Sequence, residues 1–332
     1  MRENCFRAQT GHRGVEKKGN AMTFTTFVRR TLVLPVALAW LAACSGYHGS
    51  NLAPATTLQS SASMPFALAP GATSLLYVSD QPSKDVAVFT FPQGQSMGTL
   101  AVFQPAGECV SKSGNVFIAN SSKSNVLVYA HGGTKPTRTI TDPGYYPLGC
   151  SVDPVTGNLA VTSYTGTKNA GGLAIYARAA GKPKTFTDAS IPHMSFCGYD
   201  NAGNLFFDGF TSKHAVVVGE LPKGATKIAS VTLDQSIGVA GGVQWDGTYL
   251  AIGDVTASAI YRFKMSAGKG TKVSTVALKG SKYVDQFWIQ GTQVVAPDYI
   301  SGNVRFYKYP GGGSPIKIIS GFTAPIAATV SP

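Results

Sequence analysis

Charged side chains are scarce in this chain of 332 residues. Asp, Glu, Lys and Arg make up 13% of it, whereas globular proteins ordinarily carry about 25%. Helices at a protein surface need charged or polar residues on their solvent side, so we expect neither a helix-rich fold nor a coiled coil. The chain instead contains 38 Gly and 19 Pro, with 17 Phe and 14 Tyr. This composition predicts an all-β fold of short strands and tight turns.

The chain also lacks the residue spacings that mark common metal and catalytic sites. It has no C-x-x-C pair and no H-E-x-x-H pair, so neither a zinc or redox motif nor a metalloprotease motif is present. Residues 94–98 match the G-x-S-x-G pattern. That pattern requires a strand-to-helix turn, and here it joins two predicted strands. We interpret it as a chance match.

Cysteines are few, and their number is odd in the predicted body of the protein. Cys5 and Cys44 belong to the N-terminal region, which leaves Cys109, Cys150 and Cys197. An odd number leaves at least one thiol unpaired within the chain. The pattern favours small buried hydrophobic residues, with a disulfide or a reactive thiol as open alternatives.

The N-terminal region is typical of an export signal. From Met22, a basic start with Arg29 and Arg30 precedes an apolar stretch of 13 residues, 31–43. This run is too short to span a bilayer as a helix but suits the core of a signal peptide. We therefore predict a signal peptide over 22–43. Residues 1–21 are interpreted as a misassigned upstream extension, with Met22 as the true start.

The signal ends in Leu41-Ala42-Ala43-Cys44, which resembles a bacterial lipobox. The resemblance implies that the Cys44 thiol is diacylated and becomes the mature N-terminus. The membrane is then a partner through the lipid anchor, and the protein belongs to the cell envelope. Ser45, rather than Asp, favours the outer over the inner membrane by resemblance to enteric sorting. The body of the protein would then lie in the periplasm or at the surface.

Removing the leader lowers the positive charge. Seven of the 28 basic and two of the 16 acidic residues lie in residues 1–43, so the net charge falls from +12 to +7. No recognisable nucleic-acid-binding module accompanies this charge. We expect no nucleic-acid partner.

An internal repeat begins at Leu75, after a Ser-, Gly- and Ala-rich tether predicted over 44–73. A Gly-Asn or Gly-Thr turn before an apolar strand recurs with spacings of 43, 46, 44 and 44 residues. The second residues of these turns are Asn115, Asn158, Asn204, Thr248 and Thr292. Residues 75–332 hold six copies of about 43 residues, each with four short strands. A period of 40 to 45 with four strands per copy predicts a β-propeller, here with six four-stranded antiparallel blades over residues 74–332.

Two segments, GNLFFDGF and PLGCSVDPVTGNLAVTS, resemble the NHL repeat. In that pattern an inner strand ends in Asp and a Gly-Asn turn leads outward. The C-terminal segment TAPIAATVSP aligns with YYPLGCSVDP, an inner strand of an earlier copy. We therefore expect the C-terminal strand to complete the first blade and close the ring, which removes free sheet edges.

Short polar residues end the second strand of several copies. They are Asp80, Asn120, Asp254 and Asp298. Such side chains bond nearby backbone in turns, and we interpret them as structural rather than functional.

The two sides of the predicted propeller differ in charge. Lysines gather in the hairpins between third and fourth strands: Lys135, Lys182, Lys184, Lys223, Lys227, Lys269, Lys272 and Lys317. Acidic residues gather on the opposite side: Asp80, Asp85, Glu108, Asp142, Asp188, Asp254, Asp285 and Asp298. We expect a basic side, attracted to anionic lipid headgroups, and an acidic side. Ordinary solubilising charge is the alternative.

Glu108, His193 and Asp285 fall near the starts of inner strands, at the predicted acidic mouth of the central channel. Six-bladed propellers of the gluconolactonase and regucalcin type, and of the streptogramin-lyase type, resemble this chain in architecture. The former imply a divalent cation held by carboxylate and amide oxygens. The cation here would be calcium or zinc, with Glu108 and Asp285 as its carboxylate ligands. The family's ligands have no residue-by-residue match in this sequence.

Two functions follow from these observations. The sequence favours a lipid-anchored propeller that is not an enzyme and binds protein or glycan, because a scaffold of variable loops needs no catalytic cluster. The alternative is a metal-dependent hydrolase, such as a lactonase, or a lyase, with Glu108, His193 and Asp285 at its site. No residue is confidently catalytic.

Overall fold

The computed structural model describes residues 73–142, 145–166 and 170–332. These residues form 24 strands, and their helical parts are two single 3-10 turns, η1 (Ser121–Lys123) and η2 (Ala177–Ala179). The all-β prediction is confirmed. The predicted leader, Cys44 and the tether up to residue 72 lie outside the described residues.

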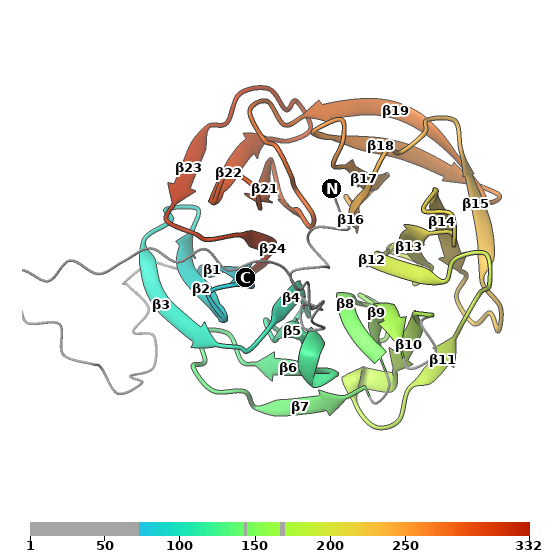
Figure 1. Cartoon of the computed structure of the whole chain (residues 1–332), viewed down its shortest axis with the longest axis horizontal. Coiled ribbons are helices and arrows are strands. Elements are labelled where there is room, and N and C mark those ends of the chain that lie inside the picture. The colour runs from blue at the N-terminus through green and yellow to red at the C-terminus, as the bar shows by residue number, and fades with distance from the viewer. Residues whose placement is uncertain (1–72, 143–144, 167–169) are drawn as a thin grey trace, which may run out of the picture. The chain divides into compact units, whose positions relative to one another are not determined.

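The strands form sheets that stand side by side around a central axis (Figure 1). One four-stranded sheet contains, from the axis outward, β24 (Pro325–Ser331), β1 (Ser74–Asp80), β2 (Asp85–Phe91) and β3 (Ser96–Ala101). The second contains β4 (Pro105–Val110), β5 (Val116–Asn120), β6 (Asn125–Tyr129) and β7 (Arg138–Thr141). The third contains β8 (Tyr145–Val152), β9 (Leu159–Gly166), β10 (Gly172–Tyr176) and β11 (Lys184–Phe186). The fourth contains β20 (Trp288–Gln290), β21 (Gln293–Asp298), β22 (Asn303–Lys308) and β23 (Lys317–Ser320).

The remaining strands form one eight-stranded sheet instead of two separate four-stranded ones. Its first half contains β12 (His193–Tyr199), β13 (Leu205–Phe210), β14 (Val216–Leu221) and β15 (Ala229–Leu233). Its second half contains β16 (Ala240–Trp245), β17 (Leu250–Asp254), β18 (Ala259–Ser266) and β19 (Lys269–Ala277). The outermost strands β15 and β19 pair in parallel at Thr232–Lys269 and Leu233–Gly270. The sequence predicted six separate sheets. The repeat shows strands but not this pairing, which arises because β19 is nine residues long and reaches the neighbouring outer strand.

The first sheet joins the two ends of the described chain. The C-terminal strand β24 runs antiparallel to β1, with Leu75 opposite Ser331 and Asp80 opposite Pro325. The predicted completion of this sheet by the C-terminal strand is confirmed. Because β24 pairs with β1, the inner edge of β1 is covered, and β24 itself forms the innermost edge of the sheet.

The periodic Gly-Asn and Gly-Thr turns have a backbone reason. Each turn connects an innermost strand to the second strand of its sheet, and its glycine adopts a positive φ, from 58° at Gly291 to 99° at Gly247. Other residues reach this left-handed region only at a cost. The glycine therefore sets the position of the turn, and the apolar strand follows in register.

The innermost strands approach one another closely because glycine leaves room for the next strand. A Cβ atom added to Gly149 in β8 would lie 2.6 Å from the Ser195 carbonyl oxygen of β12. One added to Gly198 in β12 would lie 2.8 Å from the carbonyl oxygen of Val243 in β16. Small residues in the innermost strands therefore allow these strands to approach one another.

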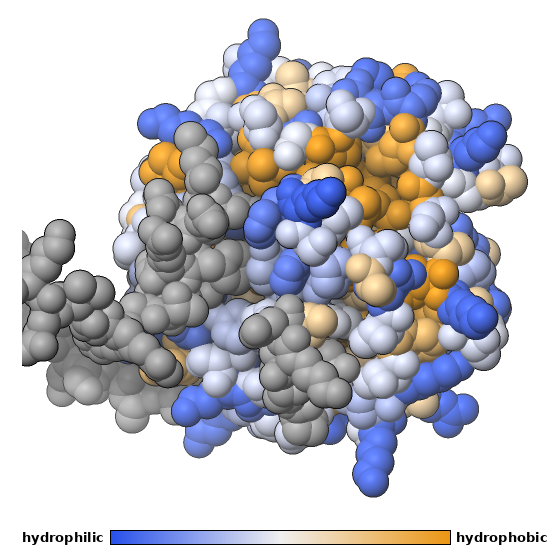
Figure 2. All heavy atoms as spheres, turned by 45° about the vertical axis from the view of Figure 1, so that its right-hand side comes forward, coloured by the Kyte–Doolittle hydropathy of each residue, from blue (hydrophilic) through white to orange (hydrophobic). Residues whose placement is uncertain are grey.

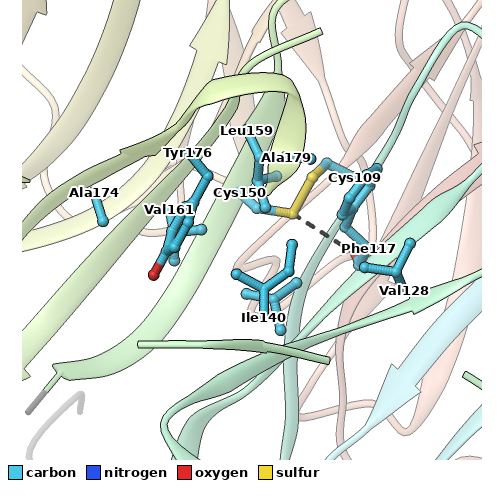
Figure 3. Close-up of a cluster of buried hydrophobic side chains, with 11 residues drawn as sticks. Cys109, Phe117, Val128, Ile140, Cys150, Leu159, Val161, Ala174, Tyr176 and Ala179 are labelled. Atoms are coloured by element: carbon cyan, nitrogen blue, oxygen red, sulfur yellow. Dashed lines mark hydrogen bonds between the residues drawn. A yellow bond between two sulfur atoms is a disulfide. The ribbon is translucent and has the colours of Figure 1, made fainter. Parts of the chain in front are cut away.

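A disulfide joins two neighbouring innermost strands. Cys109 of β4 and Cys150 of β8 are bonded and lie among buried apolar side chains, including Phe117, Ile140 and Val161 (Figure 3). Cys197 of β12 is free and buried. The sequence favoured three small buried hydrophobic residues. That interpretation holds for Cys197, whereas the disulfide alternative applies to the other two, because only the packing of β4 against β8 brings their sulfurs together.

Candidate functional site

The polar residues that end the second strands are structural. Asp80 accepts hydrogen bonds from the backbone N–H groups of Thr323 and Ala324, at 2.7 and 2.9 Å, in the loop that leads into β24. Asp298 similarly accepts from Lys282 and Tyr283 in the segment before β20. Each carboxylate satisfies backbone donors that would otherwise be unpaired. The prediction that these residues bond the backbone of their own turn holds for Asp298, which also accepts from Ser301 N at 3.3 Å, whereas the backbone partners of Asp80 belong to the distant C-terminal segment.

The acidic side is therefore much less acidic at its surface than the sequence suggests. Five of its eight predicted residues are buried, namely Asp80, Glu108, Asp142, Asp254 and Asp298. Of the eight predicted lysines on the opposite side, seven are exposed and Lys317 is partly exposed. In the view of Figure 2, hydrophilic side chains project around the outline of the molecule, and hydrophobic ones gather in patches between them. The predicted acidic side also carries exposed lysines, in the turns after second strands and in the segment before β20: Lys84, Lys123, Lys213, Lys279 and Lys282.

Glu108 is enclosed within the protein rather than placed at an open mouth. Its side chain is 0% exposed, and its Oε1 atom accepts a hydrogen bond from Ser79 Oγ at 2.6 Å. Its Oε2 atom has no hydrogen-bond partner within the described residues. Burial raises the pKa of Glu108 to about 8, although hydrogen bonds from Ser79 and the Thr329 backbone oppose the shift. The carboxyl is thus mainly protonated at neutral pH.

His193 and Asp285 occupy different surroundings. His193 is the first residue of β12. Its Nδ1 atom lies 2.9 Å from the Tyr164 carbonyl oxygen, and its ring stacks on the Tyr164 ring. Asp285 is partly exposed in the segment before β20. It is next in sequence to Gln286, which contacts Glu108, so two of the three predicted residues lie in neighbouring segments. Within the described residues, no group of three or more His, Cys, Asp or Glu side chains is arranged to hold a metal ion.

Two glutamine side chains connect segments at the axis. The Gln286 amide accepts from Glu108 N at 2.9 Å and donates to Glu108 O at 2.7 Å. The Gln244 amide of β16 accepts from Ile289 N at 2.7 Å and donates to Ile289 O at 3.1 Å. Each side-chain amide therefore bonds both the N–H and the C=O group of one residue, as the backbone of a neighbouring strand does in a sheet. These bonds hold both side chains in fixed positions.

A pocket of about 200 Å³ opens where the innermost strands end. Its lining includes the last residue of each of four innermost strands: Val110, Val152, Tyr199 and Trp245. The antiparallel order of each sheet places these ends on the side of the lysine-bearing hairpins. We call this space the axial pocket.

The lining of the axial pocket is aromatic and uncharged. Its aromatic members are Tyr199, Trp245, Phe287 and Trp288. Its polar members are Ser151, Asn201, Gln244 and Gln286. Of the described residues that line it, none is Asp, Glu, Lys, Arg or His.

All three cysteines of the body also line the axial pocket. The Cys109–Cys150 disulfide forms part of the wall that β4 and β8 contribute, and Cys197 belongs to the neighbouring strand β12. Burial raises the pKa of Cys197 to about 12, so its thiol is uncharged at neutral pH and poorly nucleophilic.

Sequence reasoning searched for carboxylates at the starts of the innermost strands and missed the aromatic residues at their ends. A signal was present, because the two tryptophans after the leader, Trp245 and Trp288, both line the axial pocket. Aligning the copies at the last residue of each inner strand would have grouped Tyr199 with Trp245. The different strand lengths and the irregular sixth copy obscured this alignment.

Sheets of four antiparallel strands around an axis, with a pocket where the inner strands end, define a β-propeller. Among solved structures, the chain is similar to one from the crystal structure of a nidogen/laminin complex, with a TM-score of 0.64 and 13% identity. This match covers 78% of the chain and 98% of that structure. It is also similar to a protein of unknown function from Bacteroides caccae, with a TM-score of 0.58, 12% identity and coverage of 78% and 98%. At these identities the likeness concerns the fold alone.

No protein-family model matches the chain, and no curated protein matches it. In the part of the chain that the structure describes, no helix has the length and apolar character needed to cross a membrane.

Proposed function

We propose that this protein is a six-bladed, NHL-like β-propeller, anchored by lipid in the bacterial cell envelope, that binds a ligand without catalysing a reaction. The eight-stranded sheet counts as two blades, because each half has four antiparallel strands. Within the described residues, the strand pairing between the halves consists of two residue pairs of their outermost strands. The ligand is a protein or a glycan.

The axial pocket carries the binding proposal. Ligand sites are concave, and they combine apolar walls with a few fixed polar groups. The axial pocket has four aromatic residues and the amides of Gln244 and Gln286, both held by backbone hydrogen bonds. Because several innermost strands build it, its shape depends on the rigid part of the fold rather than on a single loop.

The alternative function, a metal-dependent hydrolase or lyase, needs ligands that converge on one ion. The carboxyl of Glu108 instead bonds Ser79, and His193 contacts Tyr164. No observation on the described residues favours this alternative.

The anchoring proposal rests on the lipobox-like segment that ends at Cys44 and on the seven exposed lysines of the hairpin side. Lysines near a membrane surface are attracted to anionic lipids. Ser45 after Cys44 favours attachment to the outer membrane by resemblance to enteric sorting, with the propeller in the periplasm or at the surface.

Labelling with palmitate tests the anchor. Full-length protein expressed in a bacterium should incorporate the label and sediment with outer-membrane fractions. The Cys44→Ala variant should do neither, and Cys5→Ala serves as the matched control that keeps both properties. Equal labelling of the wild type and Cys44→Ala would reject lipidation at this residue.

A thermal-shift measurement tests binding. Envelope extract is separated into glycan and protein fractions, and each is added to detergent-solubilised full-length protein. A ligand that binds the native state raises Tm. We expect at least one fraction to raise the Tm of the wild type but not of Asn201→Trp, in which a large side chain obstructs the axial pocket. No pocket-dependent shift with any fraction would refute the binding function.

A further inference from the structure

The chemistry of the axial pocket narrows the class of ligand that it takes. The first restriction is charge. No residue in its described lining is Asp, Glu, Lys, Arg or His, and the disulfide sulfurs of Cys109 and Cys150 do not ionise. Moving a charged group out of water without a partner is costly. The pocket therefore favours an uncharged ligand, even though lysines occupy the surrounding hairpins.

The second restriction is the mixture of surfaces. Trp245 and Trp288 offer flat apolar area, whereas Ser151 and Asn201 offer hydroxyl and amide groups. A purely aliphatic ligand would take water away from these polar groups and return no hydrogen bond, which is unfavourable. The ligand must thus carry apolar area and hydrogen-bonding groups within one small body.

The third restriction is the fixed position of the polar groups. The amides of Gln244 and Gln286 each use one donor and one acceptor on backbone groups. An amide has two N–H donors and two oxygen lone pairs, so each retains further capacity in a fixed direction. The indole N–H of Trp245 is buried without a hydrogen-bond partner within the described residues. A ligand with several hydroxyl groups can use donors and acceptors of both kinds.

The fourth restriction is size. A volume of about 200 Å³ lies below the range of about 300 to 1,000 Å³ that is usual for ligand pockets. This favours a single ring with its substituents over a folded protein element or a long oligosaccharide. A longer chain could place only one of its units inside.

We infer that the axial pocket binds one uncharged sugar ring, with its C–H face against the tryptophans and its hydroxyls on the fixed amides. This inference rests on the proposed binding function and specifies its ligand. The ring can come from a soluble glycan or from the headgroup of a glycolipid, since both present the same chemistry.

Isothermal titration calorimetry of the full-length protein in detergent tests the inference. The probes are methyl glucoside and N-acetylglucosamine as neutral sugars, glucuronic acid as a charged analogue, and N-acetyltyrosinamide as a model for an aromatic side chain of a partner protein. We expect saturable binding of at least one neutral sugar. Glucuronic acid should bind at least tenfold more weakly than the neutral sugars.

Variants connect this binding to the axial pocket. Trp288→Ala should weaken sugar binding at least tenfold, and Trp288→Phe, which keeps an aromatic ring, should weaken it less. Phe103→Ala is the matched control, because Phe103 is an aromatic residue outside the pocket that is 46% exposed. It should leave sugar affinity unchanged. Equal affinities in Trp288→Ala and the wild type would overturn the assignment of the sugar to this pocket.

The remaining outcomes separate the ligand class from the function. Glucuronic acid binding as tightly as the neutral sugars would overturn the charge argument. Binding of N-acetyltyrosinamide without any sugar would overturn the sugar inference and retain a binding module for protein. Binding of no probe, together with no pocket-dependent thermal shift from envelope fractions, would reject the binding function itself. If a sugar binds, phosphatidylcholine vesicles with and without a monoglucosyl lipid distinguish a glycolipid from a soluble source.

Discussion

The buried carboxyl of Glu108 makes the stability of this protein depend on pH, and Glu108→Gln measures that dependence. Glutamine has nearly the shape of a protonated glutamate and does not ionise. Its Oε1 atom can keep the hydrogen bond from Ser79 Oγ, which is 2.6 Å long in the native protein. The substitution thus removes the titration while it preserves the packing.

The magnitude follows from the pKa of Glu108. Burial raises this pKa from an ordinary value of 4.5 to about 8. A raised carboxyl pKa means that the folded state holds its proton more tightly than the unfolded state. The full stabilising effect is present below pH 4.5 and is lost progressively as the pH rises to about 8. One pKa unit corresponds to about 1.4 kcal/mol, so the unfolding free energy should fall by about 5 kcal/mol across this range, and by about 3 kcal/mol up to pH 7.

Urea denaturation at several pH values between 5 and 9 provides the assay. The difference in unfolding free energy between Glu108→Gln and the wild type should grow in favour of the variant up to about pH 8 and then level off. Glu220→Gln is the matched control, because burial also raises the pKa of Glu220 but its side chain is partly exposed. Its difference from the wild type should change much less. Parallel pH profiles for Glu108→Gln and the wild type would refute a protonated Glu108 at the axis.

Three further predictions concern the contacts that hold the innermost strands together. Replacing both Cys109 and Cys150 with alanine should lower the unfolding free energy by about 4 kcal/mol, because the disulfide closes a long loop with a sequence separation of 41 residues. Reduction of the wild-type disulfide should lower the unfolding free energy by a similar amount, and an unchanged value in the double variant would contradict the prediction. Gly149→Val should lower the unfolding free energy measured in urea by about 1 to 3 kcal/mol, because the larger side chain overpacks against the next inner strand. A variant as stable as the wild type would show that the strands can move apart. Gln244→Leu should lower the unfolding free energy by about 2 to 4 kcal/mol, because it leaves the N–H and C=O groups of Ile289 unpaired. An unchanged urea denaturation midpoint would show that water replaces the amide.

Some features were predictable because they depend on local backbone chemistry. The turn glycines repeat every 43 to 46 residues because each needs a positive φ, from Gly114 to Gly291. Asp254 and Asp298 end strands and accept hydrogen bonds from the backbone N–H groups of Thr256 and Ser301 in their own turns, as short polar side chains do. The alignment of the C-terminal segment with an inner strand predicted the pairing of β24 with β1. In each case the residue and the structure it specifies lie close together in the sequence or recur in every copy.

The candidate site was not predictable in the same way, because its residues meet only through packing. Glu108 looked like a ligand at a channel mouth until the structure placed it against Ser79 of another sheet. The pairing of Cys109 with Cys150 depends on the distance between two adjacent inner strands. Trp245 and Trp288 belong to different copies of the repeat, and they line the same pocket only because the innermost strands converge at the axis.

The sequence by itself determined the strand repeat, the turns and the closing role of the last strand, since these follow from period, backbone preference and side-chain alternation. The tertiary structure alone decided which residues lie near the axis: a neutral aromatic pocket on the lysine-bearing side and, outside the lining of that pocket, the buried carboxyl of Glu108. The physical reason is that burial, pKa and pocket shape are set by the neighbours that other sheets supply, and the repeat pattern does not specify those neighbours.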